Sequence, residues 1–212
     1  MTTVWSSQPE VSQPHPDRIA RVGGWLFEHR TLIPLPLAIP LLLVRVGETP
    51  PSVLLLACGA TLVTLGELAR LTGVHYIGVI SRTRTDRLGP LVGAGPFSIV
   101  RNPLYLGNIA LWMGFAMLAR LLWMVPVVIL LLGLEYHAIV RWEERLLESR
   151  LGDRYLAYAA RVPRWLPRLK AVTAWRREAP YSWRQTFCSE RGTLIAIAAG
   201  SVALWIKLHL TS

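Results

Sequence analysis

The chain has 212 residues, of which 52% are hydrophobic and only 17% are charged, yet its formal net charge is +10. The high apolar content excludes an intrinsically disordered chain, which combines high net charge with low hydrophobicity. It also argues against a soluble nucleic-acid-binding domain, which does not need so much apolar surface. The combination is typical of a membrane protein whose basic residues are gathered on one face.

Neither the cysteines nor the histidines show the spacing of a metal site. Cys58 and Cys188 stand alone, and the five histidines include no pair three or four residues apart. We therefore expect two inert thiols and no bound metal.

The N-terminal region divides into two parts. Residues 1–17 are rich in Ser, Thr, Gln and Pro, which predicts a disordered tail. No short apolar segment follows a basic start, so we expect no cleaved signal peptide. Residues 17–30 mix arginines with large apolar side chains, which predicts an interfacial segment leading into the membrane.

Five apolar stretches follow, and in lipid each must be helical to satisfy its own backbone polar groups. The first contains three prolines and reaches only about 24 Å as a helix, less than the ~30 Å hydrocarbon core. The sequence therefore predicts an all-α integral membrane bundle of about five transmembrane helices. The stretches are residues 31–46, 52–71, 104–119, 121–140 and 192–210.

The basic residues predict the topology. If the N-terminus is cytosolic and each stretch crosses once, 20 of the 23 Lys and Arg residues lie inside, and only Arg45, Arg120 and Lys207 lie outside. The C-terminus is then on the opposite side. Arg120 is the single charge between the third and fourth stretches, which predicts a tight hairpin. The segments before Leu104 and after Val140 must then meet at the cytosolic surface.

The segment before this hairpin combines a glycine loop with the start of a helix. Residues 95–107 read Gly-Pro-Phe-Ser-Ile-Val-Arg-Asn-Pro-Leu-Tyr-Leu-Gly. Pro103 suits the first turn of a helix, and Asn102 before it is predicted to be the N-cap. A glycine-rich loop at a helix N-terminus lets backbone N–H groups approach a ligand closely.

The segment after the hairpin carries Glu-Glu-Arg-Leu-Leu over residues 143–147 and Gly-Asp-Arg-Tyr-Leu-Ala-Tyr over residues 152–158. Taken alone, it reads as a solvated juxtamembrane helix that ends near Gly152. In order and spacing, however, the two segments together resemble the isoprenylcysteine carboxyl methyltransferase and phospholipid methyltransferase superfamily. The resemblance covers about residues 86–168, and the first two and the last apolar stretches lie outside it.

The resemblance implies a pocket for S-adenosylmethionine at the cytosolic surface. A carboxylate such as Glu143 would stabilise the positive charges of this cofactor, and aromatic rings such as Phe97 and Tyr105 would face its adenine or sulfonium. By motif position, the residues that would contact the cofactor are Leu91, Val92, Phe97, Asn102, Pro103, Leu104, Tyr105 and Glu143.

The sequence departs from the superfamily pattern at three positions. Asn102 stands where the family has a His, Phe97 stands where it has a Tyr, and Ile139 stands where the isoprenylcysteine enzymes have a substrate-contacting Arg. The nearest substitutes for that Arg are His137 and Arg141, and Arg141 is the candidate substrate residue.

The function implied is methyl transfer to a lipophilic acceptor, either a carboxylate or an amine. A carboxylate needs no general base, whereas an amine must lose a proton, for which Tyr105 and Glu144 are the candidate catalytic residues. We expect the bilayer and the acceptor as partners, with no nucleic acid and no obligatory protein partner.

Three alternatives remain open. The first is a phospholipid N-methyltransferase, and the second is a degenerate membrane protein of the same fold that only holds anionic lipid. The third is a reductase related to the sterol reductases, in which Arg82, Arg84 and Arg87 would bind the 2′-phosphate of NADPH. The aromatic residues Trp175, Tyr181 and Trp183 are interpreted as an interface belt rather than as a nucleic-acid platform.

These interpretations divide the chain into four parts. The parts are a disordered tail (1–17), an interfacial segment with two transmembrane helices (18–85), a methyltransferase-like core (86–168), and a basic, aromatic segment with the last transmembrane helix (169–212).

Overall fold

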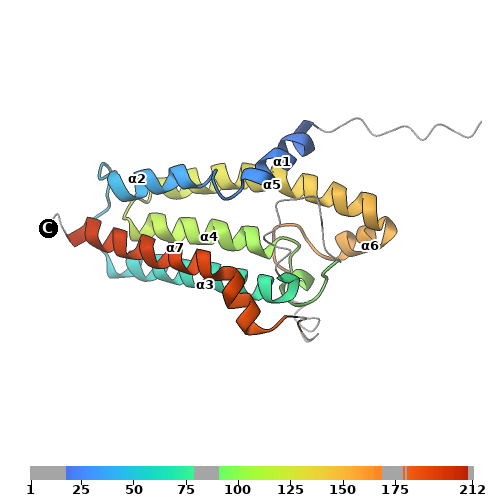
Figure 1. Ribbon diagram of the computed structural model, residues 1–212. Coiled ribbons are helices and arrows are strands. Elements are labelled where there is room, and N and C mark those ends of the chain that lie inside the picture. The colour runs from blue at the N-terminus through green and yellow to red at the C-terminus, as the bar shows by residue number, and fades with distance from the viewer. Residues whose placement is uncertain (1–17, 79–90, 169–178, 180, 210–212) are drawn as a thin grey trace, which may run out of the picture.

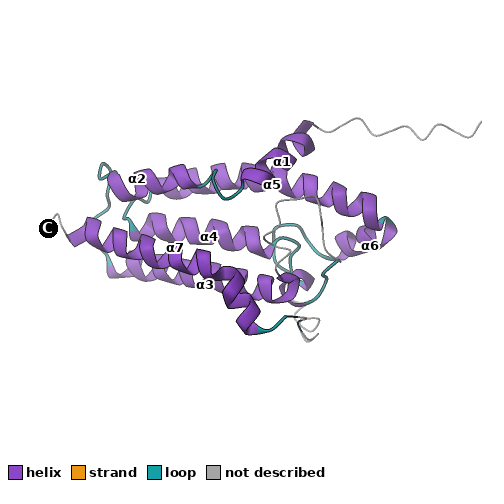
Figure 2. Cartoon of the chain, in the orientation of Figure 1, coloured by secondary structure: helices purple, strands orange, loops and turns teal. Residues whose placement is uncertain are grey.

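The computed structural model describes residues 18–78, 91–168, 179 and 181–209, and throughout this part of the chain it is helical, with no strand (Figure 2). The predicted all-α class is therefore confirmed, while the predicted tail over residues 1–17 lies outside the described residues. The elements are α1 (Arg18–His29), η1 (Leu35–Leu37), α2 (Ala38–Leu43), α3 (Val53–Ile77), η3 (Gly95–Ser98), α4 (Pro103–Leu118), α5 (Met124–Leu151), α6 (Asp153–Arg161) and α7 (Trp183–His209).

Four of these helices correspond to the second to fifth apolar stretches. Three of them, α3, α5 and α7, are long and apolar enough to cross a membrane, and α4 is a shorter apolar helix of 16 residues. They lie roughly parallel along the bundle (Figure 1). The predicted membrane helical bundle is thus confirmed, with three helices of full spanning length.

The first apolar stretch does not form one continuous helix. Its N-terminal part consists of turns, followed by η1 and the six-residue α2. Proline lacks a backbone N–H and clashes with the preceding turn, so Pro34, Pro36 and Pro40 break this stretch into short pieces. The expectation of a helical span over residues 31–46 was therefore wrong.

The segment predicted to be interfacial forms α1, which packs against α5. A Cβ atom added at Gly23 would lie 2.0 Å from the carbonyl oxygen of Ala138 in α5, so the two helices touch through their backbones. Helix α1 packs against α5, whereas α2 packs against η1 and α7. This broken segment forms one side of the bundle.

Helices α3 and α4 share the most extensive contact in the bundle. A Cβ atom at Gly66 would lie 2.7 Å from the oxygen of Gly107, and one at Gly114 would lie 2.7 Å from the oxygen of Gly59. Side chains at these positions would therefore overlap backbone atoms of the facing helix. We call these four residues the glycine seam; small residues at such interfaces let helices approach closely in membranes.

The predicted hairpin joins α4 to α5. Arg120 adopts a positive φ of 62° in this turn, and its Nε donates a hydrogen bond to the carbonyl of Thr49. The carboxylate of Glu48 lies 3.0 Å from Nη2 of Arg120 and 3.1 Å from Nζ of Lys207. Two of the three basic residues expected outside thus lie together. We call this the hairpin end of the bundle, comprising residues 44–52, residues 119–123 and Lys207.

Helix α5 continues without a break from the fourth apolar stretch through the second motif segment. It ends at Leu151, as predicted, and Gly152 follows with φ of 49°, a conformation that favours glycine. The chain then reverses into α6 (Figure 1). We call the opposite end of the bundle the α6 end, comprising residues 91–102 and 143–168.

Candidate active site

The two motif segments meet at the α6 end, as predicted from the hairpin. The backbone N–H of Arg101 donates to the carbonyl of Pro163 at 2.9 Å. The side-chain amide of Asn102 donates to the carbonyl of Arg164 at 3.1 Å. Segments that are about 60 residues apart in the chain are therefore joined directly.

Asn102 lies at the predicted N-cap position, but its side chain bonds to a distant segment. It occupies the N-cap position of α4, with Pro103 in the first turn, but its side chain makes no capping hydrogen bond. The amide is used instead to hold the chain that follows α6. The predicted N-cap position is therefore confirmed, whereas the side-chain amide donates to a distant carbonyl instead of capping the helix. The predicted contact of Asn102 with the cofactor stays a prediction.

Two tyrosines of α6 support the loop before α4. The Tyr158 hydroxyl donates to the carbonyl of Phe97 at 2.8 Å, and Nη1 of Arg101 donates to the Tyr155 hydroxyl at 3.2 Å. Burial raises the pKa of Tyr155 to about 12 and raises the pKa of Tyr158 still further. Both hydroxyls therefore keep their protons at neutral pH, which the bond from Tyr158 requires.

Gly95 opens the short helix η3 with φ of 58°. A Cβ atom at this position would lie 2.5 Å from the ring of Tyr76 in α3. The hydroxyl of Ser98 donates to the carbonyl of Gly95 at 2.6 Å, which closes the turn. Glycine is thus required here both by the backbone conformation and by the aromatic ring.

The adjacent carboxylates Glu143 and Glu144 face different partners, because successive residues of a helix point about 100° apart. Glu144 Oε1 lies 2.8 Å from Nη1 of Arg101 and accepts from Nε of Arg164 at 2.9 Å. Glu143 Oε1 accepts from the hydroxyl of Tyr105 at 3.1 Å. Glu144 therefore fastens the α6 end, whereas Glu143 faces α4.

A single cavity of about 740 Å³ runs from these residues into the bundle. Its size suits a cofactor or a drug-sized ligand. All but Pro103 of the residues predicted to contact the cofactor line it, together with both candidate catalytic residues: Leu91, Val92, Phe97, Asn102, Leu104, Tyr105, Glu143 and Glu144. The structure therefore brings these residues together around one space.

The predicted substrate residue lies elsewhere. Arg141 does not line the cavity, and neither do His137 and Ile139, of which Ile139 is fully buried in the core of the bundle. The proposed NADPH-binding cluster of Arg82, Arg84 and Arg87 lies outside the described residues.

Sequence reasoning missed four polar residues of the cavity wall. Asn108 of α4, Tyr136 of α5, and Glu190 and Thr193 of α7 line the cavity beside Arg70 of α3. Arg70 Nη2 lies 2.6 Å from Oε2 of Glu190. An ionisable residue inside an apolar stretch usually marks a functional position, so the sequence could have indicated Arg70. Its partner Glu190, 120 residues later, lies outside the apolar stretches and could not be found in this way.

The phospholipid methyltransferase family model matches residues 54–154. This segment is similar to that family. The match confirms the resemblance inferred from the motifs, and it covers α3 except for its first residue, η3, α4, α5 and the first two residues of α6.

Two curated proteins are similar to this chain. The cobalt-zinc-cadmium resistance protein CzcN of Cupriavidus metallidurans is 34% identical over 118 residues, which are 56% of this chain and 51% of that protein. The nickel-cobalt-cadmium resistance protein NccN of Alcaligenes xylosoxydans xylosoxydans is 33% identical over 134 residues, 63% of this chain and 58% of that protein. The chain thus spans about half the length of these relatives. No solved structure matches it.

Proposed function

We propose that the protein is a membrane methyltransferase that uses S-adenosylmethionine to methylate a lipophilic acceptor. The observation that carries this proposal is the single cavity, because it joins both motif segments of the family-matched region to an apolar interior. A cofactor and a lipid can therefore share one space.

The side chains at the α6 end fit this cofactor. S-adenosylmethionine supplies an electrophilic methyl group on a sulfonium. The Glu143 carboxylate provides the negative charge that such a cation needs in a poorly hydrated site. The ring of Phe97 provides an aromatic face, and Leu91 and Val92 provide apolar walls.

The chain's own contribution to the reaction is mainly alignment and exclusion of water. An in-line displacement depends on the approach of the two reacting atoms, so a shaped wall contributes to the rate without proton transfer. The bonds from Tyr158 to Phe97 and from Asn102 to Arg164 hold this wall in place.

The two candidate bases, Glu144 and Tyr105, have different hydrogen-bond partners. Both carboxylate oxygens of Glu144 are already engaged by the guanidinium groups of Arg101 and Arg164. Tyr105 donates to the Glu143 carboxylate, which is the arrangement that could receive a proton from an amine acceptor. We therefore assign this role to the Tyr105–Glu143 pair if the acceptor is an amine; a carboxylate acceptor needs no base.

We further propose that the α6 end faces the cytosol. This orientation rests on the predicted sorting of basic residues. The proposed partners are the bilayer and the lipid acceptor.

Binding of S-adenosylmethionine to the purified full chain tests the proposal. By calorimetry we expect Glu143→Gln to weaken binding at least tenfold, because charge-assisted hydrogen bonds contribute about 1.5–3 kcal/mol. Glu148→Gln is the matched control, since Glu148 is exposed one turn further along α5. No binding at millimolar cofactor, or equal binding by Glu143→Gln and wild type, would refute the proposal.

Lipid analysis of a deletion strain identifies the acceptor as a species lighter by one methyl group. Because the two relatives are named as metal resistance proteins, the same strains should be scored for growth with cobalt, zinc and cadmium. Restoration of both traits by wild type but not by Glu143→Gln would connect them to one activity.

A further inference from the structure

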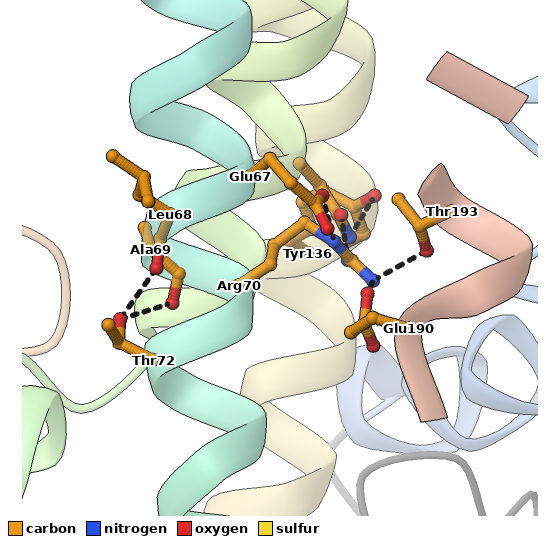
Figure 3. Close-up of polar contacts among 9 residues, drawn as sticks. Glu67, Leu68, Ala69, Arg70, Thr72, Tyr136, Glu190 and Thr193 are labelled. Atoms are coloured by element: carbon orange, nitrogen blue, oxygen red, sulfur yellow. Dashed lines mark hydrogen bonds and ion pairs between the residues drawn. The ribbon is translucent and has the colours of Figure 1, made fainter. Parts of the chain in front are cut away.

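The middle of the cavity wall carries a polar cluster built from four helices. Arg70 of α3 reaches across the bundle to Glu190 and Thr193 of α7, with Tyr136 of α5 beside it (Figure 3). Asn108 of α4 completes the cluster. All five residues line the cavity, and Glu190 and Tyr136 are each 1% exposed.

The charge of Arg70 is already engaged within the protein. Nη2 donates to Glu190 at 2.6 Å and to Thr193 at 3.1 Å, Nη1 donates to the amide oxygen of Asn108, and Nε lies 3.5 Å from Glu67. A charged ligand group would have to displace one of these buried partners. Separating a buried ion pair is strongly unfavourable, so the cluster disfavours a full charge on the ligand.

The hydroxyl groups of Tyr136 and Thr193 accept hydrogen bonds from this cluster but donate none to it. Tyr136 accepts from Nδ2 of Asn108 at 3.2 Å, and Thr193 accepts from Arg70. Each hydroxyl oxygen therefore accepts through a lone pair, and its hydrogen remains available to donate to another acceptor. Among the described residues neither hydroxyl donates to any acceptor, although both line the cavity. Tyr136 is buried and Thr193 is half-buried, so an oxygen atom of a ligand in the cavity would satisfy both donors.

The position of the cluster fits the middle of an elongated molecule. Tyr136 stacks on Tyr105 with ring centroids 4.7 Å apart, and Glu143 lies seven residues further along α5, about 10 Å by helical rise. In the other direction, Phe115 lies seven residues beyond Asn108 on α4, and the cavity there is apolar. The cluster is thus about halfway between the proposed cofactor site and the apolar end.

We propose that the hydroxyls of Tyr136 and Thr193 form a subsite for an uncharged oxygen of the acceptor, such as a hydroxyl or an ester carbonyl. The acceptor is then a lipid that carries its methylated group near Glu143, a neutral oxygen at the cluster, and a hydrocarbon chain beyond it. This inference rests on the proposed methyltransferase function. It also makes α7, which lies outside the family-matched segment, a determinant of specificity.

Binding of matched sixteen-carbon probes to the full chain in detergent tests the subsite. We expect tritiated 1-monopalmitoylglycerol, which has neutral oxygens, to bind more tightly than palmitate or hexadecylammonium. Removal of one hydroxyl by Tyr136→Phe or Thr193→Val should weaken its binding about fivefold, because a single hydrogen bond contributes about 1 kcal/mol. Thr64→Val is the control, since Thr64 bonds only to its own helix on the exposed side of α3.

Each result has a defined meaning. Equal or tighter binding of a charged probe by wild type would overturn the proposal, and so would unchanged binding of the neutral probe by both hydroxyl variants. If one variant fails to fold, the other variant and the ranking of probes on wild type still decide the question. Cofactor binding is measured on the same wild-type sample. Its failure would refute the methyltransferase function while leaving the binding of the neutral probe to be judged separately.

Discussion

The two ends of the bundle use the same arrangement of charges for different purposes. At the α6 end, Glu144 lies between Arg101 and Arg164. At the hairpin end, Glu48 lies between Arg120 and Lys207. In both places one partly buried carboxylate holds two cations from distant parts of the chain. Only the first of these groups lines the cavity, through Glu144 and Arg101.

The two groups differ in the segments that carry their basic residues. Arg101 and Arg164 belong to segments with little regular structure, so the ion pairs position the loop that precedes α4. Lys207 instead belongs to α7, and its Nζ also donates to the carbonyls of Leu41 and Val44 at the end of α2. The hairpin end therefore fastens helix ends together, whereas the α6 end shapes a binding wall.

Removal of Glu144 should break the first arrangement with the largest effect. Glu144→Ala leaves two partly buried guanidinium groups without their carboxylate, which we expect to lower the free energy of unfolding by about 2–3 kcal/mol. Cofactor affinity should fall at least tenfold, because the loop of Phe97 loses its support. Unfolding in mixed micelles and calorimetry measure the two effects; a stability loss without an affinity loss would show that the α6 end is only structural.

A change of loop geometry at the same end should have the next largest effect. Gly95→Ala places a methyl group against the ring of Tyr76 and forces a left-handed conformation on alanine, at a cost of about 2 kcal/mol. Gly93→Ala is the matched control, because its Cβ would make an ordinary contact 3.5 Å from the ring of Tyr158. We expect weaker cofactor binding only for Gly95→Ala, and equal behaviour of the two variants would contradict the close packing around Gly95.

The smallest effect is expected at the hairpin end. After Glu48→Ala, the buried Lys207 still donates to two carbonyls and Arg120 still donates to Thr49. Both cations therefore keep hydrogen-bond partners, and we expect a loss of only about 1 kcal/mol of stability. Cofactor affinity should be unchanged within twofold. A tenfold loss of affinity would mean that the two ends are coupled and would remove the distinction between them.

The sequence was informative where one residue type determines the local backbone. It predicted the end of α5 at Gly152, the start of α4 at Pro103 and the tight turn at Arg120. Because this turn is tight, the apolar stretches on either side form a hairpin, which predicted that the two motif segments meet at one end of the bundle. Such features follow from local conformational limits and from the short reach of the chain, which apply in any tertiary context.

Contacts between distant segments were not predictable in the same way. The prolines of the first apolar stretch are visible in the sequence, but a length calculated from helical rise applies only to a continuous helix, which this stretch does not form. Arg70 and Glu67 were visible as charges one turn apart near the end of an apolar stretch. The choice of Glu190 as the partner of Arg70 depends on the rotation of α7 against α3, which no periodicity specifies.

The glycine seam has a consequence for how molecules enter and leave. Because the backbones of α3 and α4 touch at Gly59, Gly66, Gly107 and Gly114, neither helix can rotate or slide without a collision between main-chain atoms. These two helices therefore act as a fixed frame. Any widening that admits a lipid or releases a product must be carried by the remaining walls of the cavity, and the proline-broken first segment is the one with the fewest helical hydrogen bonds to resist it.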